Sequence, residues 1–334
     1  MPKQLNLFYE QPSQRDRRFP FDRYVQKFKV FLRRGNSPWG QMRLFLNLCD
    51  GLKKLSVPYT VNNYKYIKRH QEEIACIVGK HTVLNKLNWK NPILYGPNVY
   101  DHPVDDPDLL QRLPIKQILV PSEWYRQMCE PAWGDLVTVW ASGVDTDKWM
   151  PKPDAEKDID FLIYNKVLWD YEQRELDLIQ PIRAALTARG LKFAEIRYDY
   201  YREEHFHSLL KRSRAMIFLS AHESLGFARL QAHSCALPVL AWDPGGFWPD
   251  PDYYPHKVRF APVTSVPYWD DRCGVRFQTI DEFSSKLTEF LEKLRSESFA
   301  PRDFVMEQFT LEKKAREYLD IVQNLELSLS YSQR

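Results

Sequence analysis

The sequence is poor in the features that mark secreted, membrane-spanning and metal-binding proteins. Its 334 residues include five cysteines, scattered without paired spacing: Cys49, Cys76, Cys129, Cys235 and Cys273. Such spacing argues against a disulfide framework and favours a reducing compartment. No run approaches the roughly twenty apolar residues of a spanning helix, and Met1–Glu10 lacks the hydrophobic region of a signal peptide. We therefore expect a cytoplasmic protein.

Neither sign of charge is in large excess, because 47 lysines and arginines nearly balance 44 acidic residues. The net charge is +3, too small to predict a nucleic-acid partner. No acid pair or histidine cluster has ligand spacing, so we expect no metal and no other required cofactor. Basic and aromatic residues from Arg15 to Arg34 suggest only a weak peripheral membrane contact. The sequence leaves the oligomeric state open.

Short apolar runs alternate with amphipathic segments along both halves of the chain. This alternation predicts an α/β protein with two Rossmann-like, doubly wound domains facing a cleft. We place the first domain at residues 1–145 and the second at 146–305. A terminal helix, followed by a frayed tail, occupies residues 306–334.

The stretch from Ser220 to Gly246 organises the second domain. A buried strand ends at Leu219, a polar turn follows, and small and apolar residues then recur with helical spacing. Val239–Trp242 predicts the next strand, so this is one unit of a parallel sheet, whose carboxyl edge is where such sheets bind ligands. Glu223 lies in that turn. A carboxylate there fits a binding site, but it also stabilises a helix start, and Ser224 has the chemistry of a simple cap.

The same stretch resembles the signature of the retaining GT-B glycosyltransferases, especially family 4. Glu223 matches the first acid of that signature, Gly226 and Phe227 match its turn, and Pro238–Val239 matches its strand. Gly245–Gly246 matches its glycine pair. Gly143–Pro151 further resembles the linker that joins the two domains of the family.

The resemblance implies transfer of a sugar from a nucleotide-diphosphate sugar to a hydroxyl of a glycan, lipid or small molecule. It implies a hexosyltransferase that retains the anomeric configuration. Residues 1–145 would form the acceptor side and residues 146–305 would bind the nucleotide sugar. The terminal helix would cross back toward the first domain.

The resemblance also implies roles for individual residues. Glu223 would bond hydroxyls of the donor sugar, and Gln231 would contact the nucleotide ribose. The turn amides of Ser224, Leu225, Gly226 and Phe227 would hold sugar and phosphate. Two residues depart from the pattern. Ser224 replaces a glycine, and Gln231 replaces a second glutamate, which removes a charge-assisted hydrogen bond.

Lys166, after the strand Asp160–Tyr164, stands where the family has an arginine that neutralises the leaving diphosphate. The second cation of the family is not evident, because Trp169–Tyr171 stands about where it would be. Tyr200 or Tyr201, after the next strand, could stack on the nucleotide base.

In the first half, a glycine-bearing loop with Gly35 and Gly40 opens a helix, which allows close backbone approach to an anion. The resemblance implies that this loop faces the acceptor and the donor phosphates. The loop after Pro92–Tyr95 contains Asn98 and His102, and the family often has a histidine near this place, close to the reacting sugar. By counting from the strand, Asn98 is the closer match. His102 has two interpretations: it acts in acid–base or hydrogen-bonding chemistry at the site, or it lies in a solvated loop without a function.

Other functions remain open on the sequence alone. One is a GT-B epimerase or phosphorylase, which would act without a separate acceptor. Another is a non-catalytic partner or sugar-nucleotide-binding protein, favoured by Gln231 and the missing second cation. A glycosidase needs two facing carboxylates, and only Glu223 is well placed.

Overall fold

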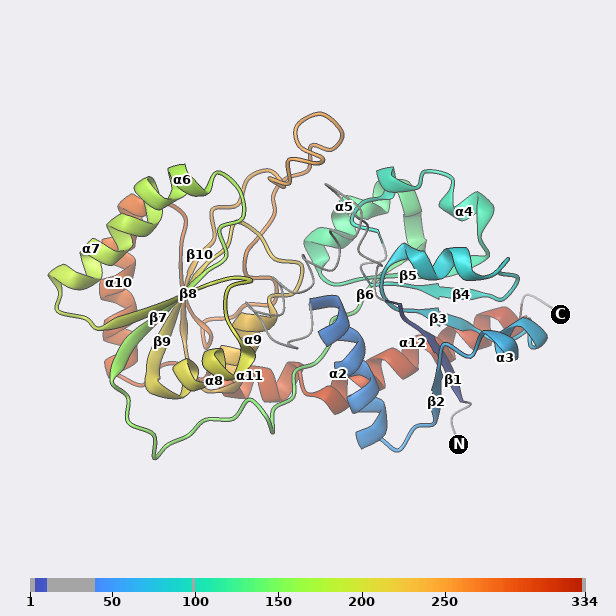
Figure 1. The fold of residues 1–334 in the computed structure, drawn as a ribbon, viewed down its shortest axis with the longest axis horizontal. Helices are drawn as coiled ribbons and strands as arrows, with labels where there is room; N and C mark the ends of the chain where they lie inside the picture. Colours follow the sequence, from blue (N-terminus) through green and yellow to red (C-terminus); the bar gives the residue numbers. More distant parts are fainter. Residues whose placement is uncertain (1–3, 11–39, 98–99, 332–334) are drawn as a thin grey trace, which may run out of the picture. The chain divides into compact units, whose positions relative to one another are not determined.

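The computed structural model describes residues 4–10, 40–97 and 100–331. The chain divides into two compact units (Figure 1). Unit 1 holds the described residues up to Asp145 together with those from Phe309 onward, and unit 2 contains Thr146–Gln308. The segment from Arg15 to Arg34, for which a weak membrane contact was suggested, and the residues Gly35 and Asn98 lie outside the described residues.

Unit 1 is built on a parallel sheet of six strands in the order β2-β1-β3-β4-β5-β6. The strands are short and mostly buried, as expected for a parallel sheet covered on both faces. They are β1 (Leu5–Phe8), β2 (Tyr59–Val61), β3 (Ala75–Ile77), β4 (Ile93–Tyr95), β5 (Ile115–Val120) and β6 (Val137–Val139).

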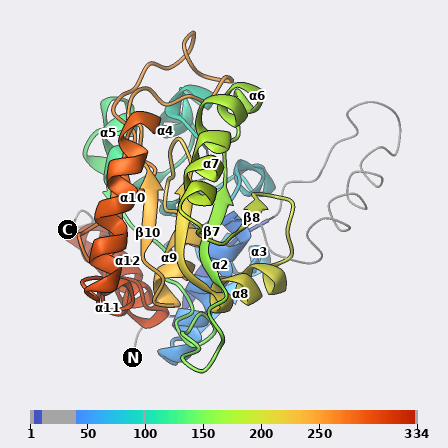
Figure 2. The ribbon, with the colours of Figure 1, turned by 90° about the vertical axis from the view of Figure 1, so that its left-hand side faces the viewer.

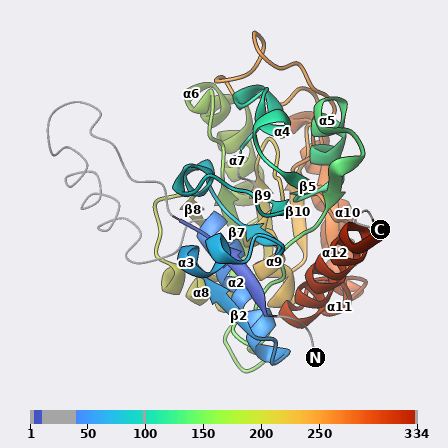
Figure 3. The same ribbon diagram turned by 90° about the vertical axis from the view of Figure 1, so that its right-hand side faces the viewer.

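Helices cover both faces of this sheet. Figures 1 and 3 show α2 and α12 on one side and α4 and α5 on the other. Cys76 of β3 lies beside Tyr318 of α12, whereas Tyr95 of β4 packs edge-on against Trp133 of α5, with ring centroids 6.2 Å apart. The helices are α2 (Gly40–Lys54), α3 (Tyr64–Arg69), α4 (Leu109–Arg112), α5 (Glu123–Trp133) and α12 (Leu311–Tyr331).

The C-terminal helix α12 completes unit 1. The indole of Trp140, just after β6, donates to the carbonyl of Lys314 (3.0 Å) and packs against Tyr318. Gly143 allows this close approach, because a Cβ there would lie 2.7 Å from the Thr310 carbonyl oxygen. At Gly51 of α2 a Cβ would lie 2.5 Å from the Leu311 carbonyl oxygen. Residues from both ends of the chain therefore share one core.

Unit 2 has a five-stranded parallel sheet in the order β11-β10-β9-β7-β8. The central strands β7 and β9 pair along most of their length, from Ile159↔Ser213 to Asn165↔Leu219. The strands are β7 (Ile159–Asn165), β8 (Phe193–Arg197), β9 (Ser213–Leu219), β10 (Val239–Trp242) and β11 (Gly274–Phe277).

This second sheet is also covered on both faces. Figures 1 and 2 show α7 and α10 on one face and α8 and α9 on the other. Ile182 and Leu186 of α7 share a core with Phe283 and Leu287 of α10 and with Phe161 of β7. The helices are α6 (Tyr171–Arg174), α7 (Gln180–Ala188), α8 (Glu203–Arg212), α9 (Phe227–Ser234), α10 (Ile280–Arg295) and α11 (Pro301–Gln308). Both sheets thus have the doubly wound α/β organisation that the sequence predicts.

Three details differ from the sequence-based expectations. The single helix expected from Glu172 to Arg189 is α6, a π-helical turn at Glu175–Ile179 and α7, with a proline at the start of α7. The chain does not fray after Leu327, because α12 continues to Tyr331, with Ser328 donating to the Leu325 carbonyl (2.8 Å).

The third difference concerns the residues between Gly246 and Cys273, for which the sequence predicts irregular surface with short strands. All of these residues are described, and none forms a strand. The segment is also not simply surface. Trp248, Val263 and Val266 are buried, and the segment folds back to the end of β10, where the Ser265 hydroxyl donates to the Trp242 carbonyl (2.6 Å).

Gly274, the first residue of β11, lies where the unit 2 sheet leaves no room for a side chain. Its φ is +145°, and a Cβ there would lie 1.9 Å from the Val239 carbonyl oxygen. We expect Gly274→Ala to lower the free energy of unfolding of unit 2 by about 3 kcal/mol or more, as measured by urea unfolding. Gly190→Ala is the control, since its φ is +66° but no atom of the described residues lies within 4 Å of a Cβ built there. It should cost only about 1–2 kcal/mol. Equal losses in both variants would contradict the clash.

His233 of α9 makes the stability of unit 2 depend on pH. The side chain is fully buried, and Nδ1 lies 3.1 Å from the Leu237 carbonyl oxygen. Burial, followed by the nearby Arg229, lowers the pKa of His233 from 6.5 to about 3. The imidazole is therefore neutral in the fold and gains a proton on unfolding below about pH 6.5, so stability falls as the pH drops from about 6.5 toward 3.

We expect His233→Met to flatten this decline by about 1.4 kcal/mol per pH unit. The measurement is the free energy of unfolding across this acidic range. His256→Gln, which removes an exposed imidazole, is the control. An unchanged slope in His233→Met would contradict the prediction.

Candidate functional site

The strand order of unit 2 reverses at β7. The chain passes from β7 to β8 on one side, and then to β9 on the other side of β7. Such a switch point opens a crevice at the carboxyl ends of the strands, where α/β sheets bind ligands. The backbone N–H of Lys166 donates to the Leu219 carbonyl (2.7 Å), which holds the ends of β7 and β9 level.

Lys166 and Glu223 meet at this switch point. Lys166 follows β7, Glu223 follows β9, and Nζ lies 2.7 Å from Oε1. The side chain of Glu223 is only 8% exposed and that of Lys166 is 20% exposed. The ammonium also lies 4.7 Å from the centroid of the Tyr198 ring. The structure thus joins two residues that are far apart in the sequence and that were both predicted as site residues.

The pair keeps Lys166 charged. Burial alone would lower the pKa of Lys166, but the Glu223 carboxylate and the Tyr198 hydroxyl together hold it above its ordinary value. A lysine with a raised pKa is a permanent cation near neutral pH. It suits the neutralisation of an anion rather than proton transfer.

The turn after Glu223 ends in a left-handed residue. Gly226 has φ +83° and is the N-cap of α9, without a side-chain cap hydrogen bond. The helix therefore begins at Phe227. Leu225, which the sequence placed on the helix face, is still in the turn, and Ser224 is not the cap. The first backbone N–H groups of a helix have no partner within the helix, and an anion can bind to such groups.

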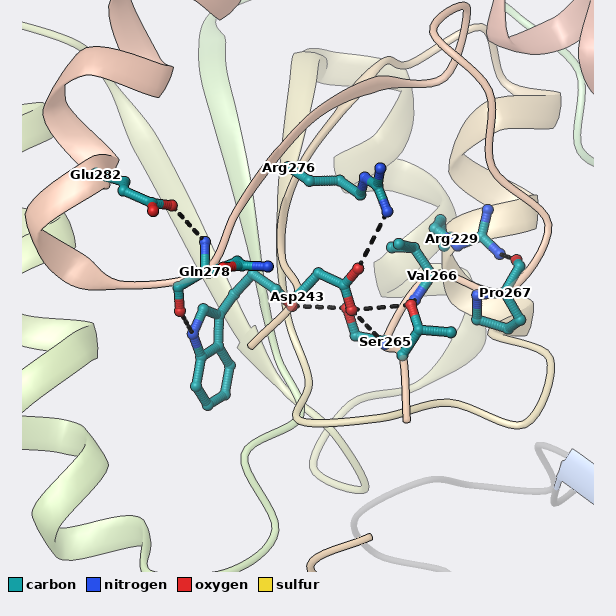
Figure 4. Close-up of polar contacts among 10 residues, drawn as sticks. Arg229, Asp243, Ser265, Val266, Pro267, Arg276, Gln278 and Glu282 are labelled. Carbon is teal, nitrogen blue, oxygen red and sulfur yellow. Dashed lines mark hydrogen bonds and ion pairs between the residues drawn. The ribbon is translucent and has the colours of Figure 1, made fainter. Parts of the chain in front are cut away.

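The loop between β10 and β11 holds the backbone of Glu223 in place. The Glu223 N–H donates to the Thr264 carbonyl (2.9 Å). Asp243, at the end of β10, in turn accepts from the Thr264 hydroxyl (2.9 Å) and the Ser265 N–H (2.8 Å) through Oδ1. Its Oδ2 lies 3.4 Å from Arg276 (Figure 4). Asp243 and Thr264 were missed from the sequence because they lie on an irregular segment with no periodic pattern.

Aromatic rings line the other side of the turn. His222 stacks in parallel on Trp169, with centroids 5.5 Å apart. Its Nε2 accepts from the indole of Trp248 (3.1 Å). Burial and then Lys166 lower the pKa of His222 to about 3, so the imidazole stays neutral and keeps this acceptor. These three residues link the loops after β7, β9 and β10 and were also missed from the sequence.

The other predicted residues of unit 2 differ in their settings. Tyr200 is 54% exposed after β8. Tyr201 is only partly exposed, and its hydroxyl lies 2.8 Å from that of Tyr164. Gln231 is 8% exposed, within α9. Tyr200 is therefore the more accessible of the two tyrosines for stacking.

In unit 1, the structure gives His102 a local task. Its Nδ1 accepts a hydrogen bond from the Val104 N–H (3.0 Å). The Asp105 carboxylate accepts a hydrogen bond from the His102 N–H (3.2 Å). This reciprocal cap closes the short turn at Pro103–Asp105. Burial lowers the pKa of His102. Gly40 begins α2, and no described atom lies within 4 Å of a Cβ built there, so packing does not require glycine.

Among the described residues, one group of potential metal ligands has donor atoms within 4.8 Å of one another: His70, Glu72 and Glu73. Its members have other partners. Glu73 accepts from Asn6 (2.7 Å) and Tyr66 (2.8 Å), and His70 stacks on Tyr66. The cluster precedes β3, at the edge of the sheet opposite the carboxyl ends. In the part of the chain that the structure describes, no helix has the length and apolar content to cross a membrane.

Comparison with known proteins supports the fold. No family model matches the chain. A probable sucrose-phosphate synthase of Thermosipho melanesiensis is 28% identical over 189 residues. The match covers 51% of this chain but only 39% of that protein, so the chain spans about two fifths of the length of its curated relative.

Solved structures match over more of the chain. The glycosyltransferase WaaG, involved in lipopolysaccharide biosynthesis, matches with a TM-score of 0.53 and 12% identity, over 95% of this chain and 99% of that one. Sucrose-phosphate synthase from Thermosynechococcus elongatus gives 0.50 and 11%, over 98% and 100%. TarM, solved as a mutant with UDP, gives 0.51 and 12%, over 77% and 57%. The chain therefore has the GT-B fold of the glycosyltransferases, as the sequence resemblance implies.

Proposed function

We propose that this chain is a retaining glycosyltransferase that takes its sugar from a nucleotide-diphosphate donor. The observation that carries the proposal is the Lys166–Glu223 pair, 2.7 Å apart at the switch point of the unit 2 sheet. A cation, a carboxylate and a helix N-terminus converge there. Together they offer groups for a leaving diphosphate and for sugar hydroxyls.

Each group has a distinct task in this scheme. When the bond between the sugar and the diphosphate breaks, negative charge grows on the diphosphate. Lys166 and the first amides of α9 stabilise that charge, which lowers the barrier. Glu223 accepts hydrogen bonds from sugar hydroxyls and orients the ring. Tyr200 stacks on the nucleotide base, and the uncharged amide of Gln231 forms a hydrogen bond with the ribose.

The acceptor is the hydroxyl of a glycan, lipid or small molecule. Gly35 and Gly40 are candidates for the loop that faces it, and Asn98 or His102 is a candidate close to the reacting sugar. We propose that no metal is required, because Lys166 and the helix amides supply the positive charge. Full transfer activity in the presence of EDTA would support this point. Activity that is lost with EDTA and restored by a divalent cation would exclude it.

Replacing Glu223 tests the catalytic role. We expect Glu223→Gln to reduce transfer about a hundredfold or more, since the neutral amide cannot accept the same charge-assisted bonds. The measurement is nucleotide release with the best donor and acceptor, and the anomeric configuration of the product is read by NMR. Asp158→Asn is the matched control, because its carboxylate pairs with Arg212 on the surface of the same unit. Wild-type turnover in Glu223→Gln, or an inverted product, would reject the assignment.

Nucleotide binding tests the donor site separately from catalysis. TarM was solved with UDP, so UDP is the first member of a panel of nucleoside diphosphates to be tested by thermal shift. A ligand at about a hundred times its Kd adds about 2.7 kcal/mol of stability. We expect one diphosphate to raise the melting temperature clearly and its parent nucleoside to raise it less. In Lys166→Met the two shifts should become similar. No shift with any nucleotide would contradict a donor site here.

A further inference from the structure

Arg229 carries a buried charge that the proposed mechanism does not use. It lies in the first turn of α9 and is fully buried. Its guanidinium donates to three backbone carbonyls, those of Leu225 (3.3 Å), Tyr268 (3.2 Å) and Pro267 (Figure 4). In the described part of the chain it bonds no carboxylate. The acids that influence it, Glu223 and Asp243, act through space.

Stability alone is a poor explanation for this residue. Neutral carbonyls compensate a buried cation less well than a carboxylate does, and apolar side chains of similar volume often replace buried charges without loss. Burial lowers the pKa of Arg229 to about 10, so the group still carries its proton at neutral pH. The chain thus maintains a full positive charge inside unit 2.

The charge lies directly beneath the turn that precedes α9. A Cβ built on Gly226 would be 3.5 Å from Nε and 3.7 Å from Nη2 of Arg229. Nε is buried and makes no hydrogen bond to any described residue. The same Cβ would lie 3.7 Å from Cγ of Glu223. Arg229 therefore adds its charge to the partial positive charge of the helix N-terminus, and Glu223, which pairs with Lys166, also acts on it through space.

We propose that Arg229 is the second positive charge of the donor site, acting on a bound diphosphate from beneath the Gly226 turn without touching it. The inference rests on the proposed donor site. In the low dielectric of a buried turn, a charge acts over a longer distance than in water. Arg229 is in this sense a positioning residue, because it acts through the turn amides.

The hydrogen bonds of Arg229 also connect Leu225 to the segment at Pro267 and Tyr268. The test must therefore distinguish the effect of these hydrogen bonds from the effect of the charge. Arg229→Met removes both the charge and the hydrogen bonds. Arg229→Lys retains a charge but loses most of the fork of donors. A purely structural role predicts that both variants behave alike. A charge role predicts that only the methionine variant loses anion binding.

The experiment is isothermal titration of the full chain with inorganic pyrophosphate, without metal, at about pH 6 so that a buried lysine remains protonated. We expect Arg229→Met to weaken pyrophosphate binding about tenfold and Arg229→Lys to stay within about threefold of wild type. Arg214→Met is the matched control, because Arg214 is exposed at the opposite end of β9. It should bind as wild type does.

The outcomes separate the two levels of the proposal. Pyrophosphate binding that is equal in wild type and Arg229→Met, or equally weakened in the lysine and methionine variants, would overturn the role of Arg229 and leave the donor site standing. Absence of binding to the wild-type chain, together with no response to the nucleoside diphosphates, would overturn the donor site itself and the inference with it.

Discussion

The pairing of β7 with β9 is the constraint on which the candidate site depends. The two strands are far apart in the sequence but are hydrogen-bonded neighbours in register from Ile159↔Ser213 to Asn165↔Leu219. Their carboxyl ends are therefore level, and the residues that follow them, Lys166 and Glu223, emerge at the same place. A slip of one residue would turn every side chain of β9 to the other face and separate the pair. The buried strand cores thus determine the geometry of an ion pair that lies outside them.

A second constraint is the irregular segment between β10 and β11. Asp243 holds it by the Thr264 hydroxyl and the Ser265 N–H, and Arg229 holds it by the carbonyls of Pro267 and Tyr268. The segment in turn holds Glu223, because the Thr264 carbonyl accepts a hydrogen bond from the Glu223 N–H. Two buried charged residues therefore act on one loop, and that loop fixes the backbone of the catalytic candidate. Buried polar groups of this kind specify a single arrangement, because leaving any of them unbonded is costly.

Much of the fold could be predicted from the sequence, and the reason is local. Val239–Trp242 is a strand with the predicted bounds, because apolar periodicity and flanking turn residues are visible in a short window. Lys166 and Glu223 were predictable because each lies in the turn after a recognisable strand and also matches the family pattern. Asp243, Trp248 and His222 were not, since their contacts join segments that no periodic pattern relates. The resemblance to a family supplied the roles, and spacing alone would not have distinguished Glu223 from a helix-stabilising acid.

The serine at position 224 shows how the structure resolves a departure from a pattern. A glycine is required only where the backbone adopts a positive φ or where another group approaches too closely for a Cβ. In this turn the positive φ falls on Gly226, at +83°, and Ser224 is not among the described residues with a positive φ. The conformational demand of the turn therefore rests on one residue, which the chain retains. Ser224 adds a hydroxyl at a partly exposed position without straining the backbone, so the substitution changes the chemistry of the turn and leaves its shape intact. The same reasoning makes Gly226 the position of this turn at which a side chain would be strained, next to the guanidinium of Arg229.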